Sequence, residues 1–262
     1  MRVAYVCADP GVPVFGCKGC SVHVQEVARA MQRQGAQVEL FATRFGGDPP
    51  SGLETVPIHK IPVAPKREPA LLERSLLAAN HDLRAMLEGN GPFDLIYERY
   101  SLWGYAGIEY AQAVGVPGLL EVNAPLVEER AKHSVLVDRA GAERVAERVF
   151  SLATGLIAVS KELVDYLERY PAVRGRVHLL SNGVDPNRFP VGLKPSYPTQ
   201  PGTFTVGFLG TLKPWHGLSL LVEAFAAVHG RDSDSLLLIV GDGPERSSLM
   251  ADLSERGLNK AV

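Results

Sequence analysis

Cysteines and a histidine near the N-terminus are the residues whose spacing first suggests chemistry. Cys17 and Cys20 form a C-x-x-C pair, His23 follows three residues later, and Cys7 lies upstream. Three cysteines and one histidine could hold zinc, and a C-x-x-C pair can also perform redox chemistry. The pair alone is a weak signal, and Cys7 falls in an apolar run where a cysteine is commonly buried. A metal or redox protein is therefore the less favoured hypothesis.

Two glycines in the same stretch suggest a different chemistry. Gly16 and Gly19 come just before a helical pattern of apolar residues, which includes Val24 and ends at Gly35. A glycine loop between a strand and a helix lets a phosphate or sugar approach the backbone, although a tight turn with positive φ explains glycine equally well. The loop has no G-x-G-x-x-G pattern, and the next strand, 37–43, ends without an acidic residue. Both features argue against dinucleotide binding.

Alternating strands and helices position these residues. The sequence patterns predict strands at 2–8, 37–43, 56–63, 94–99, 117–123, 155–160 and 176–181, and helices ending before Gly35 and at 69–88, 101–114, 125–150 and 161–170. Parallel strands joined by helices form a doubly wound α/β sheet, so we expect a Rossmann-like domain over 1–189. Residues 190–202 hold four prolines and no periodicity, which predicts a linker. Beyond the linker, 203–262 contain the first β-α units of a second Rossmann-like domain.

The composition is that of an ordinary globular protein and argues against several classes. Of 262 residues, 46% are hydrophobic and 21% charged, and the net charge of −2 gives no reason to expect a nucleic-acid partner. No apolar run approaches the roughly 20 residues of a membrane span, and the N-terminus has no signal-peptide pattern. Three cysteines do not make a disulfide framework. We expect a cytoplasmic protein, with the membrane surface as an alternative location, and the oligomeric state stays open.

Seven ordered segments resemble family 4 glycosyltransferases, which have the GT-B fold of two Rossmann-like domains. They include "KGCSVHVQEVARAMQRQGAQVELFAT", "DLIYERYSLWGYAG", "LLSNGVDPNRFP" and "VGFLGTLKPWHGLSLLVEAF". The resemblance covers essentially the whole chain, as the N-terminal domain and the start of the C-terminal one. It implies sugar transfer from a nucleotide-diphosphate donor to an acceptor hydroxyl, with retention at the anomeric carbon and without a metal or other cofactor. The acceptor itself is not specified.

The same resemblance implies that the donor binds mainly the C-terminal domain and the acceptor the N-terminal one, with the chemistry in the cleft. The family's Glu-x₇-Glu segment is not in this sequence, so a catalytically silent fragment is one alternative. A nucleotide-sugar epimerase or a glycogen-phosphorylase-like enzyme shares the scaffold but lacks signals of its own here.

The resemblance places the donor diphosphate at residues 210–217. The residues that it assigns there are Gly210, Thr211, Lys213, His216 and Gly217, while Gly241 and Gly243 would let the nucleotide approach. A helix follows this loop, and its N-terminal amides suit a diphosphate. Lys213 is a catalytic candidate, because its charge would stabilise the leaving group. The family usually has arginine at position 211 and lysine at position 216, so this phosphate clamp departs from the pattern; solvated loop residues are the alternative.

The N-terminal domain supplies the other candidates. They are Lys18 and Gly19 for the transferred sugar or diphosphate, Gly16, His23, Arg99 and Glu121 for the acceptor, and Asn123 as a second catalytic candidate. Many family members have a histidine at position 123; an amide can hydrogen-bond a sugar hydroxyl but cannot exchange protons as histidine does. Arg99 ends a strand on the side where α/β proteins bind ligands, so it either holds an anionic acceptor group or pairs with Glu98 or Glu121.

Overall fold

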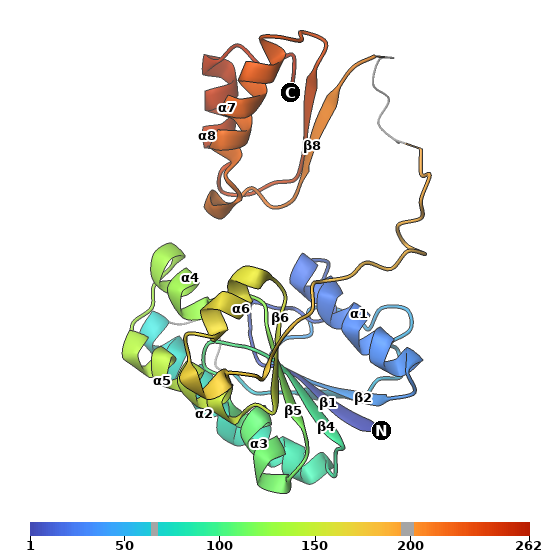
Figure 1. Ribbon diagram of the computed structural model, residues 1–262, viewed down its shortest axis with the longest axis vertical. Helices are drawn as coiled ribbons and strands as arrows, with labels where there is room; N and C mark the ends of the chain where they lie inside the picture. Colours follow the sequence, from blue (N-terminus) through green and yellow to red (C-terminus); the bar gives the residue numbers. More distant parts are fainter. Residues whose placement is uncertain (64–67, 195–201) are drawn as a thin grey trace. The chain divides into compact units, whose positions relative to one another are not determined.

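The computed structural model describes residues 1–63, 68–194 and 202–262 (Figure 1). Its contacts divide the chain into two compact units, unit 1 (Met1–Arg188) and unit 2 (Phe189–Val262). Most of the predicted linker at 190–202 falls on 195–201, which lie outside the described residues.

Unit 1 is built on a seven-stranded parallel sheet. Its strands are β1 (Arg2–Cys7), β2 (Gln37–Ala42), β3 (Ile58–Lys60), β4 (Leu95–Arg99), β5 (Gly118–Val122), β6 (Gly155–Ala158) and β7 (Val177–Leu179). They lie in the order β3-β2-β1-β4-β5-β6-β7, and every neighbouring pair is parallel. The chain runs from β1 to one edge, returns to the centre at β4, and continues to the other edge. The predicted Rossmann-like α/β fold is confirmed.

Helices cover both faces of this sheet (Figure 1). In unit 1 they are α1 (Gly19–Arg33), α2 (Pro69–Asn90), α3 (Ala106–Val114), α4 (Leu126–His133), α5 (Arg139–Leu152) and α6 (Lys161–Leu167), with a 3-10 turn η1 (Pro171–Val173). Alternate residues of β1 belong to different cores. Val3 and Tyr5 pack in the core that contains Val24 of α1, whereas Ala4 and Val6 pack with residues of α2 and α3. Burial on both faces therefore explains why the central strands are continuous apolar runs.

The longest predicted helix is interrupted. The helix expected at 125–150 is two helices, α4 and α5, separated by a short non-helical segment. The carboxylate of Glu73, on α2, accepts the backbone N–H groups of Val137 and Asp138 at 2.9 and 3.0 Å. Asp138 in turn caps α5 by accepting from the N–H of Gly141 at 2.8 Å. These carboxylates bond the amides where the second helix starts, so the chain begins a new helix there.

Unit 2 is a smaller α/β unit. It contains the parallel strands β8 (Thr205–Leu209) and β9 (Leu236–Val240), the helices α7 (Leu218–His229) and α8 (Arg246–Glu255), and a 3-10 turn η2 (Pro214–His216). Leu237 of β9 packs in one core with Val222 and Phe225 of α7 and with Leu249 of α8. In the parts of both units that the structure describes, no helix has the length and apolarity needed to cross a membrane.

Candidate functional site

The centre of the unit 1 sheet contains a topological switch point. β1 and β4 are neighbours, but the chain after β1 leads toward β3 and the chain after β4 leads toward β7. In open α/β sheets, ligands bind outside the carboxyl ends of two such strands, where the connections diverge. Cys7 at the end of β1 pairs with Arg99 at the end of β4, and Arg99 pairs with Glu121 of β5. Arg99 and Glu121 thus lie at the edge of the sheet where a ligand is expected.

Glu121 is the centre of a polar network at this edge. Its Oε1 atom lies 2.5 Å from Nε2 of His23, 2.6 Å from Nδ2 of Asn123 and 3.3 Å from Nη1 of Arg99. Its Oε2 atom accepts from the Tyr97 hydroxyl at 2.7 Å. The network unites four residues that the sequence nominated separately. Of the alternatives for Arg99, the structure shows the pairing with Glu121.

The network favours an ionised carboxylate. Burial raises the pKa of Glu121, but the hydrogen bond from His23, the Tyr97 hydroxyl and the Arg99 guanidinium together hold that pKa below its ordinary value. Burial, followed by the charge of Glu121, raises the pKa of Tyr97, so the phenol keeps the proton that it donates. An ionised carboxylate only accepts hydrogen bonds, so every one of its partners must act as a donor.

Tyr97 is a member of the network that the sequence did not single out. Two-residue spacing places Tyr97 and Arg99 on one face of β4, and the same spacing relates Glu121 to Asn123 at the end of β5. Polar residues at this spacing on neighbouring strand ends are the signal that could have found it.

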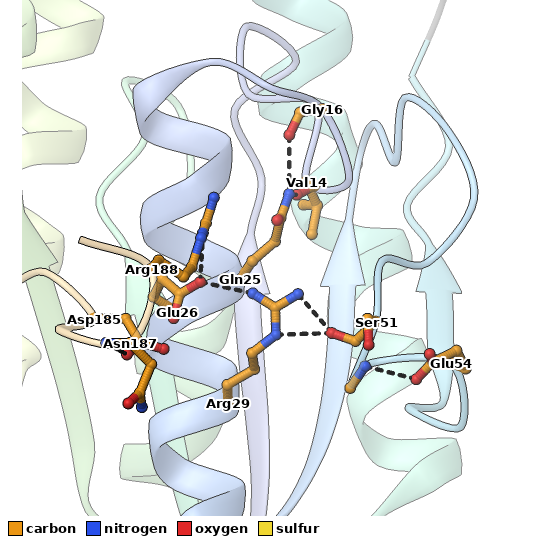
Figure 2. Close-up of polar contacts among 11 residues, drawn as sticks. Val14, Gly16, Gln25, Glu26, Arg29, Ser51, Glu54, Asp185, Asn187 and Arg188 are labelled. Atoms are coloured by element: carbon orange, nitrogen blue, oxygen red, sulfur yellow. Dashed lines mark hydrogen bonds and ion pairs between the residues drawn. The ribbon is translucent and has the colours of Figure 1, made fainter. Parts of the chain in front are cut away.

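The loop before α1 carries the predicted Gly16 and Lys18 and leads into Gly19, the first residue of the helix, and it is held in place by a buried amide. Nε2 of Gln25, on α1, donates to the carbonyl oxygens of Val14 at 2.8 Å and Gly16 at 2.9 Å (Figure 2). Because both bonds come from one buried side chain, the loop is fixed to the helix that follows it. Gln25 was also missed, since glutamine carries no distinctive signal inside a helix.

The fold requires glycine at position 16, in this loop, and not at position 19, the first position of α1. A Cβ atom at Gly16 would lie 2.9 Å from Cγ of Pro13, so packing excludes a side chain there. A Cβ atom at Gly19 would meet nothing within 4 Å. Neither glycine has a positive φ, so the turn with positive φ considered for this loop is not present. Nothing in the packing or backbone geometry explains why position 19 lacks a side chain.

The outer face of α1 binds two other segments of unit 1. Oε1 of Glu26 lies 2.7 Å from Nη1 of Arg29 and 2.9 Å from Nη1 of Arg188 (Figure 2). Arg29 also donates through Nε and Nη2 to the carbonyl oxygen of Ser51, at 3.0 and 2.7 Å. The helix that carries His23 is therefore tied both to the loop after β2 and to the last residue of unit 1.

Asn80 shapes the loop that follows β4. Its Oδ1 atom accepts the backbone N–H groups of Tyr105 at 2.8 Å and Ala106 at 3.0 Å, and its Nδ2 atom donates to the carbonyl of Trp103 at 2.8 Å. The helix expected at 101–114 therefore starts only at Ala106, because Asn80 holds the preceding residues as a loop. Sequence reasoning did not identify Asn80, which lies on a different helix.

Glu98 is a second buried residue beneath this loop. It is fully buried, and its Oε2 atom accepts the backbone N–H of Ile108 at 2.8 Å. Burial raises the pKa of Glu98 to about 7, although the bond from Ile108 acts in the opposite direction. The carboxylate of Glu98 thus serves the first turn of α3 and forms no ion pair with Arg99.

In unit 2, the loop after β8 leads to the N-terminus of α7. Gly217 precedes the helix with φ of +66°, a conformation that favours glycine. Nδ1 of His216 lies 2.6 Å from the carbonyl oxygen of Thr211, and Nζ of Lys213 lies 5.6 Å from the centre of the Trp215 ring. The first N–H groups of an α-helix lack intrahelical partners and favour anions. The residues predicted to bind the sugar donor thus lie just before a helix N-terminus, which is a position that favours anions.

The predicted Gly241 and Gly243 belong to the neighbouring loop after β9. A Cβ atom at Gly241 would lie 1.8 Å from the carbonyl oxygen of Gly210, and one at Gly243 would lie 2.4 Å from that of Leu212. Backbone bonds join the two loops, including one of 3.0 Å from the N–H of Leu212 to the carbonyl of Asp242. Close packing of the loops is thus a sufficient reason for both glycines.

The three cysteines and His23 do not form a metal site. Cys7 is buried in β1, where burial raises the pKa of its thiol to about 12, whereas Cys17 is exposed and Cys20 partly exposed. All three are free thiols. Within residues 1–63, 68–194 and 202–262, no group of three or more His, Cys, Asp or Glu side chains is placed to hold a metal ion. The metal hypothesis for this stretch therefore has no support in the described residues.

Comparison with known proteins identifies similar chains. The model of Glycosyltransferase Family 4 matches residues 18–188. The D-inositol 3-phosphate glycosyltransferase of Pseudarthrobacter chlorophenolicus is 25% identical over 245 residues, which cover 86% of this chain and 57% of the relative. The corresponding protein of Salinispora tropica is 28% identical over 265 residues, covering 92% of this chain and 54% of the relative. The chain thus spans a little more than half the length of these curated relatives.

Solved structures of similar fold cover the whole chain. Sucrose-phosphate synthase from Thermosynechococcus elongatus has a TM-score of 0.68 and 17% identity, with coverage of 100% of this chain and 69% of that one. HepE from Anabaena, solved in complex with UDP-glucose, has a TM-score of 0.65 and 15% identity, with coverage of 100% and 68%. At these identities the likeness shows the fold alone.

Proposed function

This chain belongs to glycosyltransferase family 4, and on that premise we propose that the protein transfers a sugar from a nucleotide-diphosphate donor to an acceptor hydroxyl. The observation that carries the proposal is the unit 2 loop in which Lys213 and His216 lie just before the N-terminus of α7. The leaving diphosphate gains negative charge as the sugar departs, and positive charge placed there stabilises the transition state. HepE, which has a similar fold, was solved with UDP-glucose and with UDP, which supports a nucleotide-sugar donor.

One ring nitrogen of His216 is available to contact this diphosphate. A carbonyl oxygen can only accept, so Nδ1 of His216 must carry the proton that it shares with Thr211. Nε2 is then the nitrogen left to meet a ligand. Together with Lys213 and the amides of α7, this imidazole replaces the arginine and lysine that the family usually has at positions 211 and 216.

We further propose that the transfer retains the anomeric configuration and needs no bound metal. Retention is typical of the family. The Lys213 ammonium and the N-terminus of α7 supply positive potential for a diphosphate, which is the electrostatic work that a divalent cation performs in other transferases.

Unit 1 supplies the acceptor side in this proposal. His23, Arg99 and Asn123 meet at the switch point of its sheet, where α/β proteins bind ligands. The curated relatives are by name D-inositol 3-phosphate glycosyltransferases, which supports an acceptor rich in hydroxyl groups.

Calorimetric titration of the chain with UDP, GDP and ADP tests the donor assignment. We expect one of the three to bind and Lys213→Ala to weaken its binding about tenfold, through loss of a charge-assisted contact. Lys260→Ala is the matched control, because Lys260 is an exposed lysine of the same unit. Binding of none of the nucleotides, or equal binding by Lys213→Ala, would overturn the assignment. Incubation with UDP-, GDP- and ADP-glucose in EDTA, with the anomeric signal of the product read by NMR, tests retention and metal independence.

A further inference from the structure

We propose that Glu121 sets the hydrogen-bond polarity of the unit 1 site. It holds His23 and Asn123 by their N–H groups, and so leaves Nδ1 of His23 and Oδ1 of Asn123 as acceptors for the hydroxyl groups of a polyol ligand. Glu121 is then a positioning residue that acts through its neighbours. The identity of the ligand as the sugar acceptor rests on the proposed function, whereas the polarity of the two side chains does not.

The burial of Glu121 shows that it acts through its neighbours. Its side chain is only 1% exposed, while those of His23 and Arg99 are 19% and 11% exposed. The three donors to its Oε1 atom come from different elements: α1, the end of β4 and the residue after β5. One carboxylate therefore fixes side chains that the chain brings together from three places.

The chemistry of the carboxylate determines which atoms remain free. An ionised carboxylate has no proton to donate, so the histidine nitrogen that meets it must carry hydrogen. In neutral His23 this leaves the hydrogen on Nε2 and a lone pair on Nδ1. The carboxylate orients Asn123 in the same way. Its Nδ2 donates to Glu121, and its Oδ1 remains available to accept from a ligand. Among the described residues, neither Nδ1 of His23 nor Oδ1 of Asn123 has a hydrogen-bond partner.

An ionised carboxylate accepts hydrogen bonds from all four partners at this position. These partners include the Tyr97 hydroxyl on the Oε2 side. A glutamine in its place would have only one accepting oxygen, so it could not accept from all four. The hydrogen bonds from His23 and Tyr97, together with the positive charge of Arg99, keep the buried carboxylate ionised. The Arg99–Glu121 pair is neutral as a whole, which suits uncharged hydroxyl groups.

The protonation of His23 is measured directly by ¹⁵N NMR of the histidine imidazoles in the wild-type chain. At a pH where His23 is neutral, we expect hydrogen on Nε2 and an unprotonated Nδ1. Hydrogen on Nδ1 of neutral His23 would overturn the proposal. This measurement needs no substrate and no variant, so it stands whether or not the donor assignment holds.

Two glutamine variants separate the role of Glu121 from a general effect of removing a buried carboxylate. Glu121→Gln should change the tautomer balance of His23, because the amide no longer forces a donor toward position 121. Glu39→Gln is the matched control: Glu39 is also buried, accepts from Nε2 of His59 at 2.9 Å and pairs with Arg2. It should change the signals of His59 and leave those of His23 unchanged. An unaltered His23 tautomer in folded Glu121→Gln would overturn the positioning role.

Myo-inositol is the probe for the ligand, with inorganic phosphate as the comparison. Addition of myo-inositol should shift Nδ1 of His23, and Glu121→Gln should weaken that response about tenfold. Glu39→Gln should respond as the wild type does. A response to phosphate but not to myo-inositol would show that the site recognises negative charge. It would overturn the assignment of the site to hydroxyl groups. Nucleotide binding by unit 2, measured on the same samples, reports the proposed function separately.

Discussion

Nε2 of His23 lies 2.5 Å from Oε1 of Glu121, although 98 residues separate the two in the chain. One residue lies on a helix that follows β1 and the other near the end of β5, so the contact exists only because β1, β4 and β5 are adjacent. The strand order of the sheet therefore determines which residues meet at the site. Substitution of Glu121 tests how much their contacts contribute to stability.

Glu121→Gln should alter the acid sensitivity of the fold. The pKa of Glu121 in the folded chain is below its ordinary value of 4.5, so the unfolded chain binds the proton first as the pH falls. The stability from this carboxylate is fully present above pH 4.5 and is lost as the pH falls through the folded pKa. At pH 7 we expect the variant to be less stable by about 1–3 kcal/mol, from the lost charge-assisted bonds.

Urea unfolding followed by circular dichroism, at pH 7, 5, 4 and 3, measures this difference. The gap between wild type and Glu121→Gln should narrow as the pH falls below 4.5. Glu129→Gln, on the exposed face of α4, is the control and should match the wild type throughout. A gap that stays constant across the pH range would contradict the prediction.

Glu98→Gln should show the opposite dependence. The pKa of Glu98 in the folded chain is about 7 against an ordinary 4.5, so between these values the folded chain binds the proton and the unfolded chain does not. Stability from this residue therefore falls as the pH rises from 4.5 to 7, by up to roughly 3 kcal/mol. Relative to the wild type, the variant should gain stability over this interval. Parallel unfolding curves for the two proteins, with Glu147→Gln as the exposed control, would refute this expectation.

Gly19→Ala and Gly243→Ala should have opposite effects on stability and binding. A Cβ at position 19 has open space, so the first variant should fold as the wild type does and weaken binding of the nucleotide sugar to which Gly19 is assigned. A Cβ at position 243 would collide with the backbone of Leu212, so the second should destabilise unit 2 by about 2 kcal/mol or more. In a Trp103→Phe background, Trp215 is the remaining tryptophan and reports unfolding of unit 2. Normal nucleotide-sugar binding by Gly19→Ala would remove the reason to assign Gly19 to a ligand.

The three thiols should react with Ellman's reagent in a fixed order. Cys17 is exposed and should react first, Cys20 is partly exposed and should follow, and Cys7 should react only after denaturation because it is buried in β1. Metal analysis of the same protein checks the alternative. Stoichiometric zinc together with protected Cys17 and Cys20 would revive the metal hypothesis.

The sequence predicted those parts of the fold that depend on local pattern. The apolar runs of β1 and β5 needed only neighbouring residues to be recognised. The break between α4 and α5 was not predicted, because it depends on Glu73, which lies 64 residues before Val137. Long-range hydrogen bonds of this kind leave no periodic signal.

The candidate site was predictable to a similar extent. His23 and Asn123 were predicted one by one from the resemblance to the family, and Arg99 from its place at the end of a strand, where α/β proteins bind ligands. Their common dependence on Glu121 was not predictable, because it requires the register that sets Arg99 beside Glu121. Glu121, the residue to which the other three side chains bond, is almost fully buried.

The double ion pair at Glu26 gives the end of unit 1 a dependence on ionic strength. Arg188 is half exposed and shares one carboxylate oxygen of Glu26 with Arg29, so dissolved ions reach both ion pairs. At physiological ionic strength, interactions between exposed charges decay over about 8 Å and weaken as salt increases. The buried network around Glu121 is shielded from such ions. Salt therefore loosens the point where the chain leaves unit 1, while the arrangement of the side chains at the switch point is preserved.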